Sequence, residues 1–335
     1  MRHYFVNIFR NILRRHLCSE MNSNSLIGRS FLQPTDFSSD EIKSLFWTAS
    51  EFKAISNGDF RNNNLENKSV TLLLTEPNIH IQCAAQNAGN FLKVPVKVIV
   101  DPVWETWQFP EDAGRILGKT CNIILLKSLF HSKSKALADG AKVPVIILSD
   151  KRFANLRTLS DVFTLREQFG YLEDIHICWI GSPTSLINTY LLVVPRMGIK
   201  MKYFACQHSG EKVSPVTLSA AQHLGKIFTE NCTEVSSMNE ALSHSKIVIM
   251  GSNLGGQKQI NDHNCKEADH DFFIFHSMPR TPVEICPTIF ASDRNLTWAS
   301  YRNYKWILAA FLLRTLADHK HITEPLNYVQ KNQEK

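Results

Sequence analysis

The chain has 335 residues, of which 44% are hydrophobic, and its formal net charge is +6. This length and hydrophobic content suffice for a sizeable core and predict a globular protein of two ordinary domains. The charge does not indicate nucleic-acid binding, because Arg2, Arg10, Arg14 and Arg15 lie in a leader with no acidic residue before Glu20. Removing these four charges from +6 leaves +2, so we predict no nucleic-acid partner.

The leader, residues 1–24, places arginines between apolar residues at roughly helical spacing and then becomes rich in Ser and Asn. This pattern is typical of a mitochondrial transit peptide, with an ordinary amphipathic helix as the alternative. We therefore expect the protein in the mitochondrial matrix. No later stretch approaches the roughly 20 apolar residues that a transmembrane helix needs, so we expect no membrane span.

The chain has 8 cysteines, which are widely scattered, and none of them forms a C-x-x-C pair. This spacing indicates neither a zinc site nor a disulfide framework. We expect no metal and no cofactor, and most of the cysteines should be small core residues in a reducing compartment.

Mostly apolar runs bounded by turn residues predict buried parallel strands, and longer helical stretches lie between them. This alternation predicts an α/β fold with doubly wound parallel sheets. The predicted strands are Ser69–Leu74, Val96–Val100, Ile123–Leu126, Val143–Leu148, His176–Ile180, Lys200–Ala205, Ile247–Met250 and Phe272–His276. The predicted helices include Ser39–Ser56, Asp112–Leu117, Leu156–Phe169, Ser185–Met197, Ser214–Leu224, Met238–His244 and Asn303–His319.

The stretch from Leu156 to Gly170 is the predicted bridge between an N-terminal domain, residues 25–168, and a C-terminal domain, residues 169–302. The last strong helix, within residues 303–321, is apolar enough to pack against the body of the protein. Residues 322–335 are polar and contain Pro325, so we expect a loose tail.

Seven short motifs lie along the chain at Gly28–Leu32, Asn67–Val70, Glu111–Leu117, Ser160–Glu167, Trp179–Gly181, His276–Arg280 and Asn303–Trp306. No single motif is specific, but their order and spacing over about residues 28–320 resemble those of the ornithine carbamoyltransferases, in the aspartate/ornithine carbamoyltransferase family. The resemblance implies a trimer that borrows active-site residues between subunits, with carbamoyl phosphate on residues 25–168 and ornithine on 169–302. It also implies that the C-terminal helix packs back on the N-terminal domain.

On the carbamoyl phosphate side, the resemblance implies a Ser-Thr-Arg-Thr-Arg run at a helix N-terminus, where hydroxyls, guanidiniums and the helix dipole bind phosphate. The matching residues here have lost both arginines, although Asn78 can still cap the helix. The family's His-Pro-x-Gln becomes Ala-Asn-Leu-Arg, and two further arginines become lysine and tyrosine. The substituted positions are Asn78, Ile79, His80, Ile81 and Gln82, then Lys127, Ala154, Arg157 and Tyr304.

The family's His-Cys-Leu-Pro-Arg motif reads His276, Ser277, Met278, Pro279, Arg280, so the cysteine position carries a hydroxyl. His276 and Arg280 are the well-matched polar survivors. On the amino-acid side, Asp-Gly-Asn-Asn becomes Ser182 to Ser185, and the aspartate that handles the substrate ammonium groups becomes Gly251. The Ser-Met-Gly loop reads Leu254, Gly255, Gly256, so nothing remains to recognise ornithine's charged ends.

These substitutions predict a catalytically inactive carbamoyltransferase-like protein that binds a ligand or assembles with itself or with an active relative. One alternative is an active transferase with an altered substrate, which would use Lys127, Arg157, His276 and Arg280. A second is a small-anion site at His80, Lys127, Arg157 and Arg280. A third is a structural or interaction protein that uses the aromatic loop of Trp104, Trp107 and Phe109 as an interface, a plug or simple packing.

Overall fold

The computed structural model describes residues 25–55, 60, 63–173, 175–206, 212–252, 254, 259–319 and 321. The predicted transit peptide, the tail of residues 322–335 and the site positions Gly255 and Gly256 lie outside these residues.

The first half of the described chain builds a four-stranded parallel sheet in the order β2-β1-β3-β4. Strand β1 reads Val-Thr-Leu-Leu-Leu and is buried along its whole length, as expected for a strand covered on both faces. Leu72 and Leu74 pack with the side chains of α2, α3 and α12, whereas Leu73 packs with those of α4 and α5. The elements of this half are β1 (Val70–Leu74), β2 (Val96–Val100), β3 (Ile123–Lys127), β4 (Val145–Ser149), α2 (Ser39–Ala54), α3 (Ile79–Leu92), α4 (Glu111–Leu117) and α5 (His131–Ala141).

The second half builds a five-stranded parallel sheet in the order β7-β6-β5-β8-β9. Its central strand β5 divides its side chains in the same way: Trp179 packs with Tyr190 of α7, and Cys178 packs with Leu242 of α10. The elements are β5 (His176–Gly181), β6 (Lys200–Ala205), β7 (Cys232–Glu234), β8 (Ile247–Met250), β9 (Phe273–His276), α7 (Ser185–Val193), α8 (Pro215–Gln222), α9 (Lys226–Asn231), α10 (Met238–Leu242) and α11 (Pro287–Ala291).

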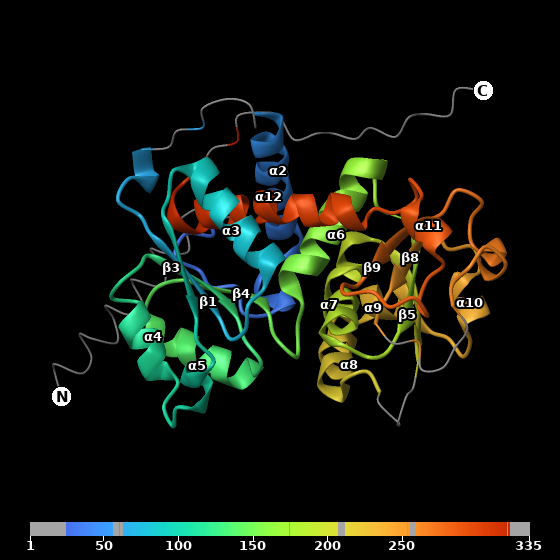
Figure 1. Ribbon diagram of the computed structural model, residues 1–335, viewed down its shortest axis with the longest axis horizontal. Helices are drawn as coiled ribbons and strands as arrows, with labels where there is room; N and C mark the ends of the chain where they lie inside the picture. The colour runs from blue at the N-terminus through green and yellow to red at the C-terminus, as the bar shows by residue number, and fades with distance from the viewer. Residues whose placement is uncertain are drawn as a thin grey trace.

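Two helices join the halves. Helix α6 (Asn155–Phe169) runs from β4 to β5, and α12 (Thr297–Leu316) packs against α2, α3 and α6 (Figure 1). The prediction that this last helix begins at Asn303 is wrong. Thr297 starts it because the Thr297 N–H donates to Asn295 Oδ1 at 2.9 Å, while Thr297 Oγ1 accepts the His276 N–H at 2.9 Å.

The predicted α/β class with doubly wound parallel sheets is confirmed, and each predicted strand lies within a residue or two of an observed one. Strand β7 and helices α5, α9 and α11 were not predicted from the sequence. Short 3₁₀ turns supplement the helices at Pro34–Asp36, Asn63–Leu65, Val103–Thr106, Pro195–Met197 and Asn264–Glu267. Within the described part of the chain, no helix combines the length and apolar character that a membrane crossing requires.

Each sheet reverses its strand order once, between β1 and β3 in the first and between β5 and β8 in the second. In open α/β sheets, ligands bind beyond the carboxyl ends of the strands at such reversals. Asn78 follows β1 and Lys127 ends β3, whereas Gly251 follows β8. The fold therefore places the predicted site residues of both sheets at the positions where the architecture favours binding.

Candidate functional site

A cavity of about 160 Å³ lies where the carboxyl ends of the first sheet meet α7, α12 and the segment after β9. Most of the predicted carbamoyl phosphate positions line it. Five lining residues were not predicted: Leu148, Ser149, Leu156, Leu186 and Tyr301. The predicted residues that line it are Asn78, His80, Ile81, Lys127, Ala154, Arg157, Ser277, Met278 and Tyr304.

The N-terminus of α3 retains its helix cap but not a phosphate clamp. The Ile81 N–H donates to Asn78 Oδ1 at 3.1 Å, so one of the free N–H groups of the first turn is already satisfied by the chain. Ile79 is 76% exposed, and neither it nor Gln82 lines the cavity. The helix end therefore offers the cavity a neutral surface.

Arg157 is the buried cation of the cavity, and its charge is already compensated. Its Nε donates to Asp161 Oδ2 at 2.7 Å, and the same oxygen accepts the Tyr190 hydroxyl at 2.6 Å. Burial by itself lowers the pKa of the Arg157 guanidinium, but the Asp161 carboxylate and the neighbouring tyrosine phenols together outweigh it, and the net shift is upward. One further nitrogen donates to the His276 carbonyl at 3.3 Å, while Nη1 has no hydrogen-bond partner among the described residues.

The second cation, Lys127, is also paired within the chain. Its Nζ lies 2.5 Å from Glu76 Oε1, and Glu76 immediately precedes the Pro77–Asn78 entry to α3. The lysine side chain is only 12% exposed, whereas that of Glu76 is 60% exposed. An incoming anion would have to compete with a carboxylate that the chain itself supplies.

His80 adds no positive charge at neutral pH. Burial lowers the pKa of its imidazole, and the nearby cations Arg157 and Lys127 lower it further. Its ring lies against two aromatic residues of α12, with centroid distances of 5.0 Å to Tyr301 and 6.3 Å to Tyr304. Tyr304 is buried where the resemblance implies an arginine, and burial raises the pKa of its phenol, so it stays neutral.

The segment after β9 does not form a nucleophile and base pair. His276 is buried; its Nδ1 donates to the Ser277 carbonyl at 2.5 Å, and its Nε2 lies 3.4 Å from Glu284 Oε2. Burial lowers the pKa of the His276 imidazole. Ser277 faces the cavity but His276 does not line it, as expected for neighbours on an extended segment. In this segment the Glu284 carboxylate, the His276 imidazole and the Ser277 hydroxyl therefore do not line up as a nucleophilic triad would require.

Arg280 does not join the other cations in the cavity. It is exposed, and its guanidinium lies 4.1 Å from the centroid of the Phe290 ring. A site that combines Arg280 with His80, Lys127 and Arg157 is therefore not present in this arrangement. The cation–π contact gives Arg280 a packing role on the surface of the second half.

The described amino-acid positions, Ser185, Gly251 and Leu254, also lie outside the cavity lining. Leu254 is buried in the apolar core of the second sheet, and the Ser185 carbonyl accepts the Thr189 hydroxyl at 2.8 Å. A Cβ atom at Gly251 would lie 2.4 Å from Cζ2 of the buried Trp179 ring. The side chain that the family pattern places here has no room, because the tryptophan fills that space.

The aromatic loop does not plug the cavity. Trp104 is buried with the side chains of α4 and α5, whereas Trp107 and Phe109 are 36% and 55% exposed. None of the three is among the residues that line the cavity. Trp104 therefore belongs to the core, and the prediction of an interface now applies only to Trp107 and Phe109.

Two unpredicted residues at or next to the cavity, Asp161 and Tyr301, could have been found from their spacing in the sequence. Asp161 lies four residues after Arg157 on α6, and Tyr301 lies three residues before Tyr304 on α12, both of which are spacings for side-chain contact on a helix. Chemically, the described cavity offers two cations, each with its own carboxylate, a neutral imidazole and two neutral phenols. It suits a small, weakly charged ligand rather than a phosphate dianion.

The comparisons with known proteins agree with this architecture. Residues 29–167 match the family model of the aspartate/ornithine carbamoyltransferase carbamoyl-P binding domain. The chain is 24% identical over 328 residues to the mitochondrial ornithine transcarbamylase of Gallus gallus, covering 92% of each chain. It is 21% identical over 313 residues to the mitochondrial ornithine carbamoyltransferase of Aquarana catesbeiana, covering 88% of this chain and 89% of the relative.

Solved structures show the same fold. The ornithine carbamoyltransferase of Pyrococcus furiosus superposes with a TM-score of 0.78 at 18% identity, covering 88% of this chain and 99% of that one. A mitochondrial ornithine carbamoyltransferase from Coccidioides immitis gives 0.76 at 18% identity, covering 85% and 96%. The order of the motifs, the two parallel sheets and these matches all point to the same similarity. Over most of its length the chain resembles the ornithine carbamoyltransferases, and residues 29–167 match the carbamoyl-P binding domain of the aspartate/ornithine carbamoyltransferases.

Proposed function

We propose that this protein is a catalytically inactive carbamoyltransferase homologue of mitochondria that acts by binding or by assembly. The observation that carries the proposal is the charge pairing in the cavity. Lys127 is paired with Glu76 and Arg157 with Asp161, while His80 is neutral at pH 7. Transfer of a carbamoyl group requires cations and donors around a phosphate dianion and around the developing oxyanion. No described residue of the cavity supplies an uncompensated cation for either.

The energetic deficit supports inactivity. Charge-assisted hydrogen bonds contribute about 1.5 to 3 kcal/mol each, so four or five lost contacts forfeit roughly 6 to 15 kcal/mol, without strict additivity. Binding at 1 μM corresponds to only about 8 kcal/mol. The cavity of about 160 Å³ also falls below the roughly 300 Å³ at which ligand pockets usually begin, and carbamoyl phosphate must share its site with ornithine.

The test is isothermal titration of the full chain with carbamoyl phosphate, together with an assay for citrulline formation from carbamoyl phosphate and ornithine. The Gallus gallus enzyme serves as the positive control under identical conditions. We expect no heat at millimolar carbamoyl phosphate and no citrulline. Micromolar binding or measurable citrulline would overturn the proposal and favour an active transferase with Lys127 and Arg157 as its anion-binding groups.

A second candidate function, small-anion binding, has one observation in its favour. Nη1 of Arg157 is buried beside the cavity with no hydrogen-bond partner among the described residues. A cavity of about 160 Å³ corresponds to about five waters at roughly 30 Å³ each, so the ligand would have only a few heavy atoms. Thermal shifts with formate, bicarbonate and phosphate test this reading. A shift that disappears in Tyr304→Phe but persists in Arg280→Ala would place the anion in the cavity.

The remaining parts of the proposal have separate tests. Import of the full chain into isolated mitochondria, compared with a chain that lacks residues 1–24, tests the transit peptide. Sedimentation alone and with an active relative tests the homotrimer and the mixed assembly. In this proposal, residues 25–168 and 169–302 are the two domains, and Trp107 and Phe109 are the exposed aromatic residues that self-association would cover.

A further inference from the structure

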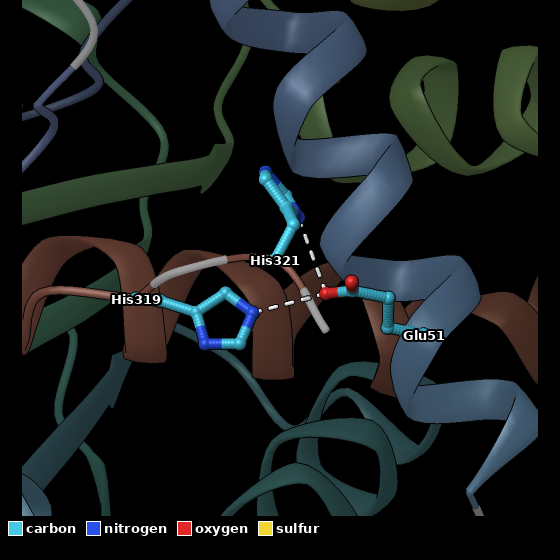
Figure 2. Close-up of side chains that lie close together, drawn as sticks. All are labelled: Glu51, His319 and His321. Carbon is cyan, nitrogen blue, oxygen red and sulfur yellow. Dashed lines mark hydrogen bonds and ion pairs between the residues drawn. The ribbon is translucent and has the colours of Figure 1, made fainter. Parts of the chain in front are cut away.

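A compact group of ligand-type side chains lies at the end of α12 remote from the cavity. Glu51 comes from α2, and His319 and His321 come from the segment that follows α12 (Figure 2). His319 Nε2 lies 3.0 Å and His321 Nδ1 lies 3.1 Å from the same carboxylate oxygen, Glu51 Oε2. These three atoms all lie within 4.8 Å of one another.

The spacing fits a tetrahedral metal centre after a small expansion. Zinc binds imidazole nitrogen at about 2.0–2.1 Å and carboxylate oxygen at about 2.0–2.2 Å, so two ligands at a tetrahedral angle lie roughly 3.3–3.5 Å apart. The observed nitrogen to oxygen distances of 3.0 and 3.1 Å are a few tenths shorter. Each nitrogen has to move only slightly away from the carboxylate oxygen to admit the ion, and the two nitrogens already lie within 4.8 Å of each other.

The surroundings hold the group in place and shield it. The side chains of Glu51, His319 and His321 are 1%, 5% and 15% exposed. The His321 ring stacks on Trp47 with a centroid distance of 3.6 Å, which fixes its orientation. On its other nitrogen, His321 Nε2 lies 3.3 Å from Ser44 Oγ, a suitable outer partner for a metal-bound imidazole.

Among the described residues around this group, Arg314 opposes a cation. Its Nη1 lies 3.1 Å from His321 Nε2, and a guanidinium can only donate there. When His321 Nδ1 binds a metal, Nε2 carries the proton and donates to Ser44, and Arg314 has to turn away. Metal binding therefore exchanges one hydrogen-bond arrangement of His321 for another.

We propose that Glu51, His319 and His321 form a binding site for a divalent transition cation of the zinc class. The ligand atoms are Glu51 Oε2, His319 Nε2 and His321 Nδ1. The N–H proton that each neutral imidazole now points at the carboxylate moves to the other nitrogen of the same ring on binding, through exchange with solvent. Three protein ligands leave the fourth position to water.

The bound ion would clamp α2 to the segment after α12 and so fix one end of this helix. Tyr304 and Arg314 are ten positions apart on α12, which corresponds to about 15 Å at 1.5 Å per residue. The metal site is therefore separate from the cavity, and its test does not depend on the proposed function.

The experiment uses the full chain, freed of metal with a chelator that is then dialysed away. Co²⁺ is titrated with detection of its visible absorption, and Zn²⁺ is titrated by calorimetry. We expect one ion per chain and a rise in Tm with Zn²⁺, because an ion that binds the folded state stabilises it. Glu51→Gln should weaken binding by more than about tenfold, since even the loss of an outer partner has effects of 10- to 100-fold.

Two further variants keep the result interpretable. His321→Phe retains an aromatic ring to stack on Trp47 but removes the ligand, so it should fold in chelator and lose the Zn²⁺-dependent rise in Tm. His270→Ala removes a histidine whose side chain is 94% exposed and should bind Zn²⁺ like the unmodified chain. No stoichiometric ion in the unmodified chain would overturn the proposal, as would equal affinity in Glu51→Gln and His321→Phe.

Discussion

Replacing Asp161 by Asn should be among the most destabilising single changes in α6. Asp161 is fully buried and accepts hydrogen bonds from Arg157 Nε at 2.7 Å and from the Tyr190 hydroxyl at 2.6 Å. Asparagine keeps the shape of the side chain but removes its charge, and it leaves the buried guanidinium of Arg157 uncompensated. Breaking a buried ion pair in this way costs about 3–5 kcal/mol. A domain is stable by only about 5–15 kcal/mol, so the loss is a large fraction.

Urea unfolding, followed by both tryptophan fluorescence and far-UV circular dichroism, measures this change. Asp112→Asn is the matched control, because Asp112 pairs with Arg115 across one helical turn but both side chains are exposed, and its loss should stay within about 0.5 kcal/mol. The double variant Arg157→Met, Asp161→Leu removes both charges and should recover most of the stability. If Asp161→Asn costs less than about 1 kcal/mol, or if the double variant is no better than the single one, the reasoning about a buried compensated pair fails.

Two further outcomes test the packing and the electrostatics. Gly251→Ala should destabilise the chain by about 1–3 kcal/mol in the same urea assay, because its Cβ would lie 2.4 Å from the Trp179 ring. Gly251→Asp should be more destabilising still and should not create ornithine binding. An unchanged unfolding midpoint for Gly251→Ala would contradict this reasoning. Glu41 is desolvated, which raises the pKa of its carboxyl, but bonds from Arg29 and the Ser38 N–H outweigh this and lower it below its ordinary value of 4.5. The folded-state pKa is depressed, so this stabilisation is present above pH 4.5 and is lost as the pH falls through the folded-state value. Glu41→Gln should therefore flatten the acid limb of the unfolding free energy below pH 4.5, and an unchanged limb would rule out the pair of Glu41 and Arg29 as its source.

Local patterns in the sequence were enough to predict the fold class. Apolar runs such as Ser69–Leu74 and Ile247–Met250 coincide to within a residue with strands β1 and β8, which are buried at every position, because a strand buried on both faces must be apolar along its length. Elements with weaker patterns were missed. The short strand β7 carries only Cys232 in the core, and its remaining residues are exposed, so it has no signal that periodicity could detect.

The sequence by itself also determined which chemical groups are missing. The absence of arginine and of hydroxyl side chains from residues 78–82, and of a thiol from position 277, follows from residue identity alone. The pairing of the remaining charges is only partly visible in the sequence. The spacing of four residues on α6 favours a pair between Arg157 and Asp161, but the burial of that pair depends on the tertiary structure. The pairing of Lys127 with Glu76 depends on the mutual position of β3 and the entry to α3.

Only the tertiary structure decided which distant residues meet. It moved Arg280 out of the cavity and onto Phe290, and it showed that Trp179 occupies the space beside Gly251. It also joined Glu51 to His319 and His321, which lie 268 and 270 residues further along the chain. Periodicity reports contacts within one helix or strand, where neighbours are a few residues apart. Contacts between remote segments are set by the packing of whole elements, which no short stretch of sequence records.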